Sequence, residues 1–128
     1  MRDYKKLLVW ERAHKFALEI YNLSKLFPKE ELYGITSQIR RASLSIPTNI
    51  AEGSGKNTSK DFSKYLGIAA GSASEVDYLL LFIKELKLVD NGKIELLINE
   101  VNEIKKMLNA FQLKIHSDAK VQLLKASS

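Results

Sequence analysis

Apolar residues recur at steps of three and four along almost the whole chain, and no segment alternates apolar and polar residues with a period of two. The pattern divides into four segments, over about 8–27, 28–53, 59–88 and 94–116. Each segment places its apolar side chains along one face of a helix. Four helices with short connections predict an all-α fold, an antiparallel up-and-down four-helix bundle.

Two prolines and one capping sequence set the expected helix boundaries. Pro28 favours the end of the first helix and the start of the second, because the residue before a proline avoids helical angles and a first-turn position needs no amide donor. Pro47 lacks the amide that the carbonyl of Ser43 would use, which predicts a kinked second helix. Thr58 and Asp61 have the spacing of a capping box, which predicts the start of the third helix near Ser59.

The 128 residues, with a hydrophobic content of 45%, are enough for one ordinary domain. We expect a single four-helix-bundle domain over 1–117 and a frayed or disordered tail over 118–128, where the apolar pattern weakens. The absence of cysteine excludes disulfides and thiolate metal sites. The apolar run at 7–10 is too short for a signal sequence, and the longest run, 78–83, is far below the ~20 residues of a membrane span. These features predict a cytoplasmic protein without a membrane partner.

The third helix is apolar on nearly every side around 78–83, where a bundle needs only one apolar stripe. A smaller surplus lies at the start of the first helix. Surplus apolar surface is typical of a subunit interface, which predicts a homo-oligomer. The expected interface residues are Leu7, Leu8, Tyr78, Leu79, Leu81 and Phe82.

The formal net charge of +5 is unevenly distributed along the chain. Residues 1–64 carry twelve basic and seven acidic residues, whereas 65–128 carry eight of each. This asymmetry favours an anionic partner, RNA or DNA before a membrane. Aromatic residues that could stack on bases, such as Tyr4 and Tyr33, are few, so we expect phosphate contacts with little base readout. The candidate nucleic-acid-binding residues are Lys5, Lys6, Arg12, Lys15, Arg40, Arg41, Lys56, Lys60 and Lys64.

The segment 40–56, RRASLSIPTNIAEGSGK, superficially resembles a phosphate-binding loop. It fails the Walker pattern, because Ile50 stands at the first glycine position, Asn57 at the last, and no strand precedes it. Its small residues, together with those at 69–74, instead predict close helix contact with a polar network. The expected members are Arg41, Ser45, Asn49, Glu52 and Glu75, with Arg41 paired to Glu52 or Glu75. Which of Arg40 and Arg41 faces outward is left open by the sequence.

The sequence gives little support for a catalytic site or a metal site. Glu11 and His14 have the E-x-x-H spacing of di-iron bundles, but His116 has Leu113 where the second motif needs a glutamate. No histidine and aspartate are poised to activate a serine. The sequence therefore predicts neither an enzyme nor a metal site, and no cofactor.

Three stretches carry a family resemblance: VWERAHKFALEIYNLSKLFPKEELYG, QIRRASLSIPTNIAEGSGK and YLGIAAGSASEVDYLLLFIKEL. In order and spacing, 4–111 resembles the four-helix-bundle family called 23S rRNA intervening-sequence proteins. The most specific part is 38–53, followed by Gly71, Ser72 and Glu75. The resemblance implies a homopentamer, and a fold similar to the accessory variability proteins of diversity-generating retroelements, which bind nucleic acid through a basic surface and partner a reverse transcriptase. It transfers no catalytic residue.

Residues and resemblance together predict a non-enzymatic homopentameric bundle that binds RNA or DNA by phosphate contact. The alternative is a protein-interaction scaffold that docks a nucleic-acid-processing enzyme, with the positive charge serving that partner.

Overall fold

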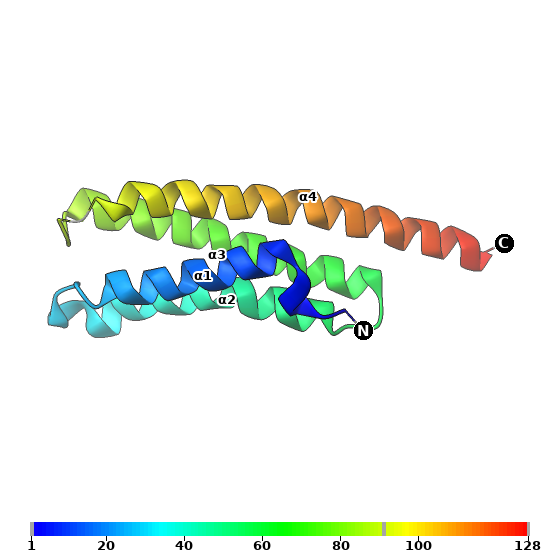
Figure 1. Ribbon diagram of the computed structural model, residues 1–128, viewed down its shortest axis with the longest axis horizontal. Helices are drawn as coiled ribbons and strands as arrows, with labels where there is room; N and C mark the ends of the chain where they lie inside the picture. The colour runs from blue at the N-terminus through cyan, green and yellow to red at the C-terminus, as the bar shows by residue number, and fades with distance from the viewer. Residues whose placement is uncertain (1, 91, 128) are drawn as a thin grey trace.

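The computed structural model describes residues 2–90 and 92–127, and within these ranges it contains four long helices and no strand. The helices are α1 (Leu8–Ser24), α2 (Ser37–Ser54), α3 (Ser59–Leu86) and α4 (Lys93–Ser127). They run alternately up and down in chain order (Figure 1). The predicted all-α antiparallel four-helix bundle is confirmed.

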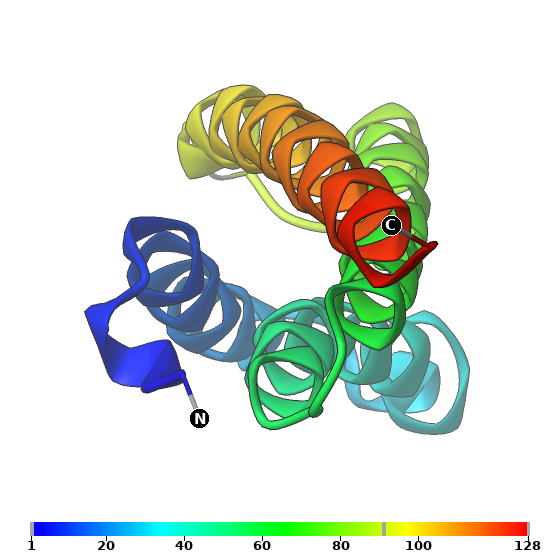
Figure 2. The same cartoon turned by 90° about the vertical axis from the view of Figure 1, so that its right-hand side faces the viewer.

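Each helix lies beside the next one in the chain, as the end-on view shows (Figure 2). α3 packs extensively against both α2 and α4, whereas α1 and α4 meet less extensively. A short 3-10 helix, η1 (Tyr4–Lys6), precedes α1. η1, the turn between α2 and α3, and the last turns of α4 lie at one end of the molecule, and α4 projects beyond the other helices there (Figure 1).

The core is formed by the inward apolar stripes of all four helices. The large side chains with less than 2% of their surface exposed are Phe16, Phe62, Ile20, Ile39, Ile46, Ile50, Leu66, Leu80, Ile83, Ile104, Leu108 and Val76. All of them stand at the three- and four-residue steps of the sequence pattern, since those steps keep side chains on one helix face.

The second helix begins later than the sequence predicted. The first helix ends at Ser24, and two short segments follow before α2: η2 (Lys29–Glu31, 3-10) and η3 (Leu32–Thr36, a π-helical turn). Gly34 interrupts the helix with φ −108° and ψ −114°, a combination open to a residue without a Cβ atom. The predicted continuous helix from Pro28 is therefore wrong, and the break lies at Gly34.

The helix α2 continues without interruption through Pro47, which is buried. Side chains bond to carbonyls nearby: the hydroxyl of Ser43 donates to the carbonyl of Arg40 at 3.1 Å, and that of Thr48 to the carbonyl of Leu44 at 2.8 Å. A kink at Pro47 stays a prediction. The predicted start of α3 is confirmed, because the Asp61 amide donates to the Thr58 hydroxyl at 3.1 Å.

The helix α4 is longer than the sequence predicted. It reaches Ser127, so the described part of the expected tail, 118–127, is helical. Fraying or disorder of this segment stays a prediction, and Ser128 lies outside the described residues. The segment 117–127 contains no glycine or proline, and alanine, lysine, glutamine and leucine are strong helix formers. Helix propensity therefore extends α4 although few of its last residues are buried.

Among the described helices, α3 is long and apolar enough to cross a membrane by length and composition alone. The same composition is required of a core helix that packs against two neighbours. Ten of its residues, from Ser59 to Ile83, are buried inside the bundle. The packing of α3 against α2 and α4 thus accounts for its apolar character.

Candidate functional site

One end of the molecule carries the entire excess of positive charge. It is formed by residues 2–6, 51–64 and 112–127, which we call the basic end. The Arg2 guanidinium lies 4.6 Å from the ring centre of Phe62, and the Gln112 side chain donates to the Ser63 carbonyl at 3.0 Å, so the three segments are joined by direct contacts.

The basic end holds nine basic residues and four acidic ones, whereas the rest of the chain holds eleven of each sign. The nine are Arg2, Lys5, Lys6, Lys56, Lys60, Lys64, Lys114, Lys120 and Lys125, and the four are Asp3, Glu52, Asp61 and Asp118. Antiparallel packing therefore gathers the whole net charge of +5 at this end.

Five of the predicted nucleic-acid-binding residues belong to the basic end. The side chains of Lys6, Lys60 and Lys64 are exposed and make no hydrogen bond or ion pair within the described chain. The ammonium group of Lys56 lies 5.2 Å from the ring centre of Tyr65, and that of Lys5 lies 5.9 Å from Tyr4. Neither contact neutralises the lysine, so all five remain available to phosphates.

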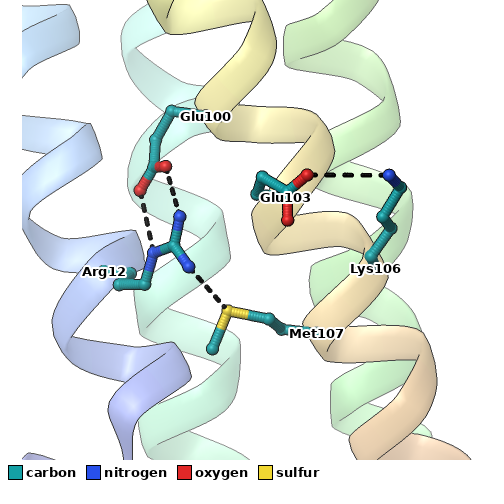
Figure 3. A network of polar contacts seen from close by, with 5 residues as sticks. All are labelled: Arg12, Glu100, Glu103, Lys106 and Met107. Atoms are coloured by element: carbon teal, nitrogen blue, oxygen red, sulfur yellow. Dashed lines mark hydrogen bonds and ion pairs between the residues drawn. The ribbon is translucent and has the colours of Figure 1, made fainter.

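Arg12 is placed differently from the prediction. It joins α1 to α4 by two bonds to Glu100, from Nε to Oε2 at 3.1 Å and from Nη2 to Oε1 at 2.5 Å (Figure 3). Its Nη1 also lies 3.3 Å from the sulfur of Met107. The bond to Glu100 raises the pKa of the Arg12 guanidinium above its ordinary value, although desolvation opposes this. Arg12 is thus a structural residue that neutralises a carboxylate.

The remaining three predicted residues lie away from the basic end. Lys15 forms an exposed ion pair with Glu11, 3.0 Å long. Arg40 turns towards α1, where its Nε donates to the Ser24 hydroxyl at 2.7 Å. Arg41 is exposed and has no bonding partner within the described chain. The open question is thereby answered: Arg40 is held within the protomer and Arg41 faces outward.

The predicted polar network between α2 and α3 forms in part. The hydroxyls of Ser45 and Ser72 lie 2.8 Å apart, and the Asn49 amide donates to the Ser45 hydroxyl at 2.9 Å. Gln38 reaches the carboxylate of Glu75 at 3.5 Å. The predicted pairing of Arg41 with Glu52 or Glu75 is not formed among the described residues, because Arg41 points to solvent instead.

The glycine-rich turn at 53–56 is a packing feature. A Cβ atom on Gly53 would lie 2.6 Å from the Cβ of Tyr65 and 3.0 Å from the ring of Phe62. Glycine is required there because α2 and α3 approach closely as the turn begins. A Cβ atom on Gly67 would lie 2.7 Å from the side-chain nitrogen of Gln112, whereas a Cβ atom on Gly71 would meet nothing within 4 Å. Gly71 thus has no packing partner within the protomer.

The predicted interface residues separate into exposed and buried groups. Tyr78 (61% exposed), Leu81 and Phe82 (43%) lie on the surface of α3, and Leu8 is exposed on α1. Leu79 is only 5% exposed and belongs to the core, and Leu7 is partly buried against it. Leu79 was wrongly assigned because the four residues 79–82 are all apolar, and composition alone does not show which face turns inward.

No group of three or more histidine, cysteine, aspartate or glutamate side chains that could hold a metal ion occurs in the part of the chain described. His14 instead stacks on Trp10, with ring centres 4.9 Å apart and planes 7° from parallel. His116 is exposed near the far end of α4. The two histidines therefore belong to different parts of the molecule.

Comparison with known proteins identifies the family and agrees with the four-helix fold. The model of the 23S rRNA-intervening sequence protein family matches residues 5–110, most of the chain. This protein belongs to that family. Among solved structures, it is similar to a protein of unknown function from the S23 ribosomal protein family of Bacteroides thetaiotaomicron. The two share 28% identity with a TM-score of 0.76, over 82% of this chain and 98% of the other. None of the curated proteins matches the sequence.

The match to the intervening-sequence family does not cover the whole basic end. Arg2 precedes the matched residues, and Lys114, Lys120 and Lys125 follow them. The sequence did not point to these four residues, because the net charge was compared only between residues 1–64 and 65–128. The predicted antiparallel topology could have revealed them, because it brings the start of the first helix, the turn between the second and third helices, and the end of the fourth helix to the same end of the bundle.

Proposed function

We propose that this protein is a non-enzymatic homo-oligomer of the cytoplasm that binds RNA or DNA by contacts to phosphate through its basic end. The observation that carries the proposal is the location of the whole net charge of +5 in residues 2–6, 51–64 and 112–127. Phosphate contacts by lysine and arginine supply most of the sequence-independent affinity of nucleic-acid-binding proteins.

Oligomerisation would multiply this charge. A cyclic assembly repeats every surface group once per subunit, so a ring of five, as the family resemblance implies, would present five copies of the basic end. Clustered charge of one sign raises the local potential and attracts an anionic polymer over a distance. We therefore propose a pentamer in which the basic ends act together.

The outer face of α3 supports self-association. Tyr78, Leu81 and Phe82 are exposed there although each is large and apolar. Gly71 lies on the same helix and leaves an open space where a side chain would stand. Large apolar residues beside an unfilled glycine position suit close packing of a second subunit.

Binding measured against salt concentration tests the proposed function. We expect a labelled RNA or DNA oligonucleotide to bind at low salt, with log K falling linearly against log[salt], because bound lysines displace counterions. The double variant K60E/K64E should weaken binding at each salt concentration, and equally for unrelated base sequences.

The matched control is K25E/K29E, which makes the same charge change at the opposite end of the bundle, where both lysines are exposed. It should leave most of the affinity intact. Equal losses in the two double variants would show that only total charge matters. No binding of either nucleic acid at low salt would refute the proposal.

A second candidate function is the docking of a nucleic-acid-processing enzyme. The observation in its favour is the apolar surface of the second half of α4, where Leu113 and Leu124 are each about 70% exposed. Capture of one stoichiometric protein partner by the intact chain, unaffected by nuclease, would support this role. Loss of capture in L113E/L124E would locate it on α4.

A further inference from the structure

A hollow between η1, α1 and α2 is not explained by phosphate binding alone. It has a volume of about 480 Å³, which lies within the usual range for sites of small organic groups, about 300–1,000 Å³. Its lining combines three ring side chains with a wall from α2: Tyr4, Trp10, His14, Leu44, Pro47, Thr48, Ala51 and Glu52.

This hollow is continuous with the basic end. A second hollow of about 450 Å³ shares Tyr4 and Ala51 with it and is otherwise lined by Arg2, Asp3, Ser54 and Gly55. Together the two form a shallow groove that runs from the start of η1 along the line where α1 meets α2.

Three rings lie in series along one side of the groove. Tyr4 meets Trp10 edge to face, with ring centres 4.9 Å apart and planes at 67°. Trp10 stacks on His14 at the same separation. Trp10 packs in part against the core, Tyr4 is partly exposed and His14 is exposed, and part of each ring lines the hollow. Rings held in this way are rigid platforms for stacking.

The charges around the groove favour a particular orientation of a bound polynucleotide. Lys5 follows Tyr4 at one end, and unpaired Arg41 stands one turn before Leu44 at the other. Glu52 is the acidic residue that lines the aromatic hollow. Its carboxylate repels phosphate from the interior, while Lys5 and Arg41 attract phosphate at the rims. In the aromatic hollow these charges favour bases facing inward and the backbone outward, whereas Arg2 and Asp3 line the second hollow with one charge of each sign.

We infer that this groove binds the bases of single-stranded RNA or DNA, an inference that rests on the proposed function. In a duplex the bases are already stacked and paired, so their faces cannot reach Trp10 and His14. Stacking of bases on aromatic side chains does not depend on the base sequence, and neither do contacts between lysines and phosphates. The two kinds of contact are therefore compatible in one binding site. The wall from Leu44 to Ala51 spans about 10 Å along α2, the length of about three stacked bases.

Trp10 is the one tryptophan of the chain, so its fluorescence reports directly on the groove. The experiment titrates the intact protein with a ten-residue oligo(dT) or oligo(U) and with a duplex of the same length, at low salt. We expect the single strands to quench Trp10 and to bind at least about five-fold more tightly than the duplex.

One variant at the groove and one control variant complete the test. L44E introduces a negative charge at a side chain that is 49% exposed, so it should leave the core intact, and it should weaken single-strand binding by about five-fold or more. The control L96E places the same charge on α4, where Leu96 is 67% exposed, and should change little. Circular dichroism and thermal unfolding establish that both variants fold.

The outcomes separate this inference from the proposed function. Quenching by single strands together with weaker binding in L44E would support the groove. Equal binding of single strand and duplex without a change in Trp10 fluorescence would overturn the groove and leave phosphate binding standing. Absence of binding by either nucleic acid would overturn the proposed function, and the groove with it.

Discussion

Arg12 and Glu100 form a two-point ion pair that connects α1 to α4, the two helices that are first and last in the chain (Figure 3). They meet on the side of the bundle where packing is least extensive. The side chains are 34% and 31% exposed, so the pair lies at the edge of the core. A charge-assisted pair with this geometry helps to fix the position of α1 against α4. It does so at the interface where the fewest apolar contacts hold two neighbouring helices together.

Breaking this pair should lower stability. We expect E100Q to reduce the free energy of unfolding by about 1 kcal/mol, between the values for exposed pairs and for well-formed charged hydrogen bonds. Urea unfolding measures the change. The control E11Q removes the exposed Lys15 partner and should cost about 0.5 kcal/mol or less. Equal effects would mean that the pair between α1 and α4 is no stronger than a surface pair.

The contribution of Arg12 should not vary with pH in the neutral range. Its pKa is raised in the folded state, so the stability that it contributes is fully present below the ordinary arginine pKa and is lost only as pH rises through the higher folded value. The difference in unfolding free energy between R12Q and the natural protein should therefore be the same at pH 7 and pH 9. A difference that shrinks over this interval would contradict the assignment.

The spacing of α2 and α3 should depend on Gly53. In G53A the new methyl group would overlap the Cβ of Tyr65, an atom that moves only with its backbone, so we expect a loss of about 2 kcal/mol. G55A is the control, because a Cβ atom there would lie 3.6 Å from the Glu52 carbonyl oxygen, an ordinary contact, and φ is −84°, so we expect little change. Thermal unfolding of both variants at equal concentration checks the sign of each change.

Self-association should depend on the exposed side chains of α3. We expect native mass spectrometry to report an oligomer, with five subunits as the proposed number, and Y78E/F82E to shift it to the monomer. Glutamate at these positions places charge in an apolar contact. L96E/L113E, which changes two exposed leucines of α4, should retain the oligomer. A natural protein that is monomeric at micromolar concentration would contradict the proposed interface.

The start of α3 should depend on its capping residue. T58A removes the oxygen that accepts from the Asp61 amide and should cost about 1 kcal/mol. T48A is a suitable control, since the Thr48 hydroxyl bonds to a carbonyl inside α2 that already belongs to a helix. A larger loss in T48A than in T58A, measured by urea unfolding, would contradict the capping role.

Most of the fold could be predicted because helical periodicity is a local property. The inward stripe of α2, with Ile39, Ile46 and Ile50, follows directly from spacing. The start of α3 follows from Thr58 and Asp61, which are three residues apart. The break at Gly34 was not predicted, because a single glycine within an apolar pattern is compatible with an uninterrupted helix.

The candidate site could be predicted only in part. Lys56, Lys60 and Lys64 were found because they are neighbours along one helix and its preceding turn. The ion pair of Arg12 could not be predicted because its partner Glu100 is 88 residues distant in the chain. The aromatic hollow was missed because its two sides come from different helices, and Trp10 and Pro47 become neighbours only after those helices pack.

The sequence by itself determined which segments are helices, which faces are apolar, and how much net charge the protein carries. These properties depend on residues within a few turns of one another. The tertiary structure alone decided that Arg40 is held inward and Arg41 outward, that Leu79 is buried while Phe82 is exposed, and that the excess charge occupies one end. The physical reason is that partners and neighbours across helices are fixed by the rotation and axial shift of each helix, which depend on the packing of the whole core.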